Sequence, residues 1–153
     1  MALKQSPWAL GSQMTVRPQT AGAVHSQRFT YDVTSAAAAL AVGDIVEIGE
    51  LPPYAYVVDA LVFTEGVFTG ATADIGLMSG EYGFNDAART SGNEMFAAVD
   101  LAAASTAVAR LAKPAALLLG HTEQSRGIGV KIAGAAVAAA AGKKIHVILF
   151  FRQ

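Results

Sequence analysis

Alternating apolar and polar positions run through most of the chain after residue 25 and predict a β protein. In "RFTYDVT" the side chains of Phe29, Tyr31 and Val33 fall on one face and polar side chains on the other, as in a half-buried strand. The closing stretch "KKIHVILFFRQ" repeats this period, with Ile145 and Phe151 on the same face. Residues 26–153 are therefore expected to form one sheet-built domain.

Short apolar runs between these two strands predict further strands, because Gly and Pro separate them. Leu51-Pro52-Pro53 ends one of them, since a proline has no N–H for a ladder. The alanine run at residues 135–141 is bracketed by glycines and is expected to be a connection. Asn93 is expected to cap one short helix, "EMFAAVDLAAA". The expected strand segments are "DIVEI", "YAYVVDALVFTEG", "TADIGLMSG", "TAVARLA", "PAALLLG" and "RGIGVKIAG".

Taken together, about eight short strands, one short helix and a preceding arm predict an antiparallel β-sandwich or jelly roll. The arm is residues 1–25, which show neither a helical nor a strand period and include two prolines. Trp8 and Met14 are isolated apolar residues on it. The arm is either a loose terminus or an extended segment with no packed element of its own, whose tryptophan anchors in a neighbouring subunit.

Composition narrows the possible functions. The chain has no cysteine, and its 11 basic and 12 acidic residues give a net charge of −1, so no basic surface for nucleic acid is expected. No uncharged run approaches the ~20 apolar residues of a membrane span, and no signal peptide is evident. A cytosolic, soluble protein is expected. Hydrophobic residues nevertheless make up 53% of the chain. This excess indicates either apolar surface that another chain covers or simply tolerance of alanine.

The polar segment at residues 81–93 raises the question of catalysis. It contains acids and Arg89 but no histidine or lysine to act near neutral pH and no phosphate-binding glycine loop, so a structural joint is the favoured interpretation. Asp59, in an apolar strand, is expected to make a strand-edge or interface hydrogen bond. The glycines at 127 and 129 lack the third glycine of a dinucleotide fingerprint. The three histidines have no metal-ligand spacing. No enzyme activity, cofactor or metal is expected.

The order of these segments resembles a group of small structural proteins of tailed bacteriophages. The segments that carry the resemblance are "FTYDVTSAAAALAVGDIVEIGELPPYAYVVDALVF", "TADIGLMSG", the "NDAART" loop and "RGIGVKI", followed by an aliphatic last strand. Such proteins are thought to decorate or cement capsids. The resemblance implies a virion protein on the capsid exterior, made in the host cytoplasm, with the major capsid protein and further copies of itself, as a dimer or trimer, as partners.

On this interpretation the protein would lie across junctions between capsid subunits and rely on a few apolar anchors. The candidate interface residues are Trp8, Met14, Tyr54, Phe84 and Phe96. Two other classes stay open. A phage tail or host-attachment component could bind a carbohydrate with the aromatic residues of the 81–93 loop, and a cupin-like enzyme would need histidines and an acid that converge inside a barrel.

Overall fold

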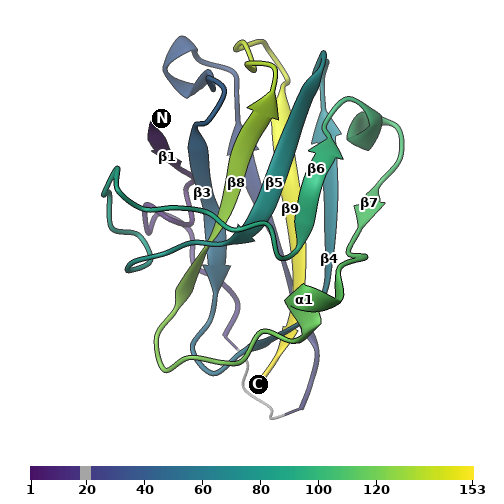
Figure 1. Ribbon diagram of the computed structural model, residues 1–153. Coiled ribbons are helices and arrows are strands. Elements are labelled where there is room, and N and C mark those ends of the chain that lie inside the picture. The colour runs from purple at the N-terminus through teal and green to yellow at the C-terminus, as the bar shows by residue number, and fades with distance from the viewer. Residues whose placement is uncertain (18–21) are drawn as a thin grey trace.

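Two β-sheets packed face to face make up the protein (Figure 1). The computed structural model describes residues 1–17 and 22–153. One sheet has the strand order β1-β3-β8-β5-β6 and the other β2-β9-β4-β7. Neighbouring strands are antiparallel, except that β1 and β3 are parallel. The predicted β-sandwich is therefore confirmed.

The strands are short and are joined by turns and two single-turn 3₁₀ helices. The strands are β1 (Leu3–Gln5), β2 (His25–Asp32), β3 (Ile45–Leu51), β4 (Tyr56–Glu65), β5 (Ala71–Leu77), β6 (Phe96–Asp100), β7 (Ala109–Arg110), β8 (Arg126–Gly134) and β9 (Lys144–Arg152). The helical segments are η1 (Ala36–Ala38), η2 (Ala103–Ser105) and α1 (Pro114–Leu117). Within the described residues, no helix reaches the length and apolar character that a membrane crossing requires.

The core lies between the sheets and is built by the two-residue period of the strands. On β9 every second side chain from Ile145 to Phe151 is fully buried, and β9 pairs with β2 on one side and with β4 on the other. The last strand, predicted from its alternation, is thus central to its sheet. The alanine run at 135–141 is a connection, as expected, and includes an isolated bridge from Val137 to Leu40.

Strand β3 is buried along its whole length, including two acidic residues, Glu47 and Glu50. A strand in a two-layer sandwich normally shows one face to solvent. Here the N-terminal segment and the loop that follows β5 lie over that face, and Figure 1 shows the loop crossing in front of β8 and β3 toward β1. This covering creates the interior in which the acidic side chains lie.

The expectation that residues 1–25 contain no packed element was wrong for the first part of the segment. Leu3–Gln5 forms β1, which pairs in parallel with β3 from Ile45 to Glu47. Ser6 is fully buried and its hydroxyl donates to the Ile48 carbonyl. Because three residues can pair through backbone groups alone, such a strand needs no side-chain alternation. Residues 18–21, within the predicted arm, lie outside the described residues.

The helix was predicted in the wrong place. The segment "EMFAAVDLAAA" instead forms β6 and η2, and Phe96 pairs with Ile75 of β5. Pairing with the open edge of β5 outweighs the helix propensity of alanine, which is only a weak preference. The α-helix lies at Pro114–Leu117, where a strand was expected; Pro114 stands at its first turn, a position that suits proline.

Candidate functional site

A buried ion pair joins the loop after β5 to strand β3. Arg89 Nη2 donates to Glu47 Oε1 at 2.6 Å, and the two side chains are 3% and 0% exposed. The other nitrogens of the guanidinium donate to loop carbonyls, Nε to Ser79 at 2.7 Å and Nη1 to Phe84 at 2.8 Å. Arg89 therefore ties the start of the loop to its tip and attaches the loop to the sheet.

The same carboxylate holds the N-terminal segment. Glu47 Oε2 accepts from the backbone N–H of Gly83 and from Gln5 Nε2, each at 3.2 Å. Gln5 Nε2 also donates to the Gly83 carbonyl at 2.9 Å. One buried acid thus connects β1, β3 and the loop, as the structural-joint interpretation of residues 81–93 anticipated. Its partner Arg89 is 42 positions away, which is why sequence spacing gave no sign of the pair.

Glycines allow the loop to lie this close to the sheet. A Cβ on Gly76 would meet the backbone carbonyl carbon of Gly92 at 2.5 Å, a separation that real Cβ atoms do not reach. A Cβ on Gly127 would collide with Glu47 Oε1. The absence of a side chain at Gly127 therefore leaves room for the Glu47 carboxylate. The loop is held in one position, and its tip carries Phe84, which is 62% exposed.

The five candidate interface residues lie in different surroundings. Met14 is 86% exposed, Phe84 62% and Tyr54 51%. Trp8 is only partly exposed, and its ring meets that of Phe29 edge-on at 5.6 Å between centroids. Phe96 is 6% exposed and belongs to the core. Three of the five are therefore free to contact another chain in the structure as it stands.

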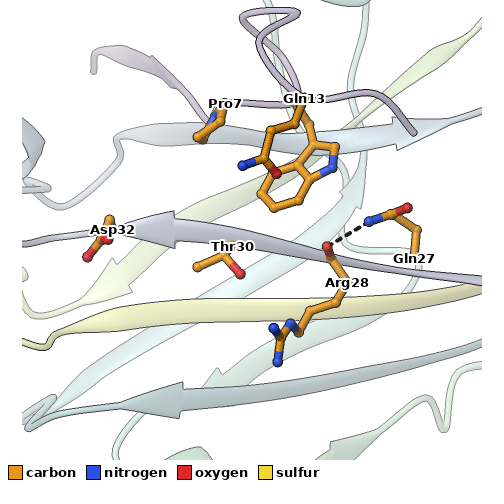
Figure 2. A pocket seen from close by; sticks show the side chains of 7 residues that line it. Pro7, Gln13, Gln27, Arg28, Thr30 and Asp32 are labelled. Carbon is orange, nitrogen blue, oxygen red and sulfur yellow. Dashed lines mark hydrogen bonds between the residues drawn. The ribbon is translucent and has the colours of Figure 1, made fainter. Parts of the chain in front are cut away.

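The N-terminal segment also forms one wall of a surface pocket of about 510 Å³. Figure 2 shows Pro7 and Gln13 of that segment on one side and β2 residues on the other. The β2 side is polar, with Gln27, Arg28, Thr30 and Asp32. Trp8 also lines it. The pocket combines one aromatic ring with several hydrogen-bonding groups.

The middle of the outer face of the four-stranded sheet, where β4 and β9 pair, is apolar. Leu61 and Phe63 of β4 alternate with buried core residues, as do Ile148 and Phe150 of β9, and all four are partly exposed. Leu61 pairs directly with Ile148. The sequence already indicates this surface, because the segments of β4 and β9 carry apolar residues on both faces of the strand. An exposed apolar surface of this kind is suited to contact with another protein.

Asp59 and Arg110 lie at the edge of this apolar face. Arg110 Nη2 and Nε approach Asp59 Oδ2 at 2.6 and 2.8 Å, and Asp59 Oδ1 accepts from the Ala60 N–H. The interpretation of Asp59 as a hydrogen-bonding acid at a strand edge agrees with this geometry. Because Arg110 is 74% exposed, the pair is one that water and salt weaken.

His146 of β9 is a buried titratable group of the same sheet. Its ring stacks on Phe63 at 4.5 Å, Nδ1 lies 2.9 Å from Thr30 Oγ1, and Nε2 lies 3.0 Å from Glu65 Oε1. Burial lowers the pKa of His146 below its usual 6.5, and Arg28 and Lys144 act in the same direction, while the bond and charge of Glu65 oppose them.

This lowered pKa predicts a loss of stability on mild acidification. The unfolded chain takes up the proton more readily than the folded chain, so the free energy of unfolding should fall as the pH drops through 6.5 and level off below the folded-state pKa. Urea unfolding at pH 7.5 and 5.5 measures the difference. The variant His146→Gln should show a smaller difference than the wild type, and equal differences would contradict the assignment.

The described residues hold no metal-binding cluster. Within residues 1–17 and 22–153, no group of three or more His, Asp or Glu side chains could hold a metal ion. His25 lies beside the Phe151 ring, His121 beside the rings of Tyr54 and Tyr56, and His146 on β9. The three histidines therefore do not converge in the way that a cupin-like site requires.

Comparison with known structures identifies the class. No protein-family model and no curated protein matches the chain. A chain in the capsid of Ralstonia phage GP4 is 42% identical to it; the match covers 99% of this chain and 98% of that one, with a TM-score of 0.89. The two-sheet sandwich is thus that of a phage capsid structural protein. The chain belongs to the same family as this chain of the GP4 capsid, and its role is structural, in the virion.

Two more distant structures share the fold. A chain of the cyanophage Pam1 capsid asymmetric unit is 19% identical, over 93% of this chain and 94% of that chain, with a TM-score of 0.58. A chain of the acid-stable capsid of Helicobacter pylori bacteriophage KHP30 is 12% identical, over 88% and 90%, with a TM-score of 0.54. At these identities the likeness concerns the fold alone.

Proposed function

We propose that the protein is a capsid decoration or cement protein, which binds on the outside of the expanded head across junctions between major capsid protein subunits. The observation that carries the proposal is the 42% identity to a chain of the GP4 capsid over nearly the full length of both chains. It would be made in the host cytoplasm and added to the shell. Its net charge of −1 suits contact with protein rather than with packaged DNA.

Two surfaces support a protein that bridges others. One is formed by the N-terminal segment and the loop after β5, which contact each other and carry the exposed Leu10, Met14 and Phe84. The other is the apolar middle of the outer face of the four-stranded sheet, with Leu61, Phe63, Ile148 and Phe150. A bridging protein needs at least two contacts, and burying both surfaces would supply the apolar area that stable protein interfaces use. We assign the first surface to the major capsid protein and the second to further copies of this chain, as a dimer or trimer.

Binding to capsid shells from which the protein has been removed tests this proposal. The wild type should co-sediment with such shells in a saturable, stoichiometric manner. Phe84→Ala should weaken the apparent affinity about tenfold or more, because an exposed aromatic anchor on a rigid loop is typical of a binding hot spot.

Val67→Ala is the matched control, since Val67 is 76% exposed in the turn between β4 and β5 and belongs to neither surface. Its affinity should change less than about twofold, as expected for contacts outside a hot spot. Equal effects of the two variants would show that the loop is not the docking element. Failure of the wild type to bind, together with binding to a glycan array, would favour a host-attachment role instead.

A further inference from the structure

A second buried carboxylate of β3, that of Glu50, has one oxygen without a partner among residues 1–17 and 22–153. Its side chain is 3% exposed, and Oε1 lies 2.8 Å from Arg17 Nη2. Oε2 is buried and has no hydrogen-bond partner among the described residues. This contrasts with Glu47 on the same strand, both of whose oxygens are paired. An unpaired buried carboxylate oxygen is costly, so a missing partner is the simplest explanation.

Glu50 lines a surface pocket of about 380 Å³ whose other walls are polar. The pocket is lined by Arg17, Glu50, Glu81, Tyr82, Gln124 and Ser125. Two carboxylates and one guanidinium make it negative on balance. Burial raises the pKa of the Tyr82 phenol above its usual range, and the charges of Glu50 and Glu47 raise it further. The phenol is neutral near pH 7 and adds a hydrogen-bond acceptor to the lining of the pocket.

The lining suits an organic cation better than a metal ion. The described residues offer no group of three acidic or histidine ligands here or elsewhere, and divalent cations need several oxygen ligands at short range. A guanidinium or ammonium group needs only one carboxylate and a few further acceptors, and its bonds to a buried carboxylate are strong. The volume is large enough to admit a side chain from outside.

We propose that this pocket, the Glu50 pocket, receives an arginine or lysine side chain from a neighbouring capsid chain. The inference rests on the proposed capsid-binding function and adds a specific electrostatic contact to it. Arg17, which is 51% exposed, pairs with the other oxygen, Oε1. Because Oε2 is buried, the Arg17 side chain would have to move aside before an incoming cation could bind it. Charge complementarity, rather than the apolar loop alone, then selects where on the shell the protein docks.

The variant Glu50→Gln tests the contact because it removes the charge and keeps the shape. Its affinity for stripped capsid shells at low salt should fall at least tenfold, and its affinity should depend less on salt concentration than that of the wild type. Glu123→Gln removes the same charge from an exposed neighbouring position outside the pocket lining and should change affinity less than twofold. Thermal unfolding of each variant confirms that the fold is kept.

Arg17→Gln separates this proposal from a purely internal role of Glu50. If Glu50 served only to anchor the N-terminal segment through Arg17, then Arg17→Gln, Glu50→Gln and the double variant would all weaken binding equally. The proposal predicts that Arg17→Gln binds as tightly as the wild type or more tightly, because it removes a competing cation.

The outcomes distinguish the two proposals. Wild-type binding with an unchanged Glu50→Gln affinity, or with equal losses for Glu50→Gln and Arg17→Gln, would overturn the Glu50 pocket and leave the decoration function standing. Absence of wild-type binding would remove both. A selective loss with Glu50→Gln alone would establish the contact.

Discussion

Replacing Arg89 with methionine should lower the free energy of unfolding by about 3–5 kcal/mol, because breaking a buried ion pair leaves the other charge without its partner. Glu47 is 0% exposed, so water cannot replace the guanidinium. The substitution also frees the carbonyls of Ser79 and Phe84, which Arg89 holds. Urea unfolding followed by fluorescence of the single tryptophan, Trp8, measures the loss.

Arg110→Met is the matched control, since it breaks an ion pair whose arginine is 74% exposed. Its cost should stay within about 1 kcal/mol. Combining Arg89→Met with Glu47→Gln should recover part of the loss, because the amide removes the unpaired charge while it still accepts the Gly83 N–H. Similar losses for Arg89→Met and Arg110→Met would contradict the view that the buried pair holds the loop on the sheet.

Truncation of Phe29 to alanine should cost a similar amount, about 3–5 kcal/mol, through a cavity in the core. Phe29 is 0% exposed. Its ring lies against the backbone of Gly49, where a Cβ would collide with it, and against the Trp8 ring at 5.6 Å. The ring therefore links the two sheets to the N-terminal segment, and neighbouring side chains cannot fill its place without moving β3.

Arg28→Ala, at the preceding exposed position of the same strand, should change stability by less than about 0.5 kcal/mol. In the Phe29→Ala variant the emission of Trp8 should also shift to longer wavelength, because the indole loses its packing partner. A stability loss under about 1 kcal/mol for Phe29→Ala would mean that the core between β2 and β3 is less tightly packed than the structure indicates.

Strands with a strict two-residue period were predictable from sequence, whereas those formed by pairing alone were not. The alternation in β2 and β9 identifies the buried side chains one by one. β1 has only three residues. β6 contains two alanines and ends in Asp100, so neither segment shows a clear alternation of apolar and polar residues. Both form because an open sheet edge lies beside them, at Ile45 and at Ile75, and this edge exists only in the folded chain.

The candidate site was predictable in its residue types but not in its geometry. The choice of Met14 and Phe84 as surface anchors agrees with their exposure, whereas the aromatic ring of Phe96 is used in the core. Where a segment has no clear helical or strand period, its sequence does not show whether an aromatic side chain points outward as an anchor or inward into the core. The acids Glu47 and Glu50 lie in an ordinary strand pattern and are buried only because the loop and the N-terminal segment cover them.

Electron cryomicroscopy of stripped capsid shells that have been re-incubated with the purified protein tests the decoration role most directly. The account predicts one stoichiometric sandwich-shaped density outside each junction between major capsid protein subunits. The loop that carries Phe84 and the Glu50 pocket should both face the shell. Shells without added density, or density with these elements turned toward solvent, would contradict it.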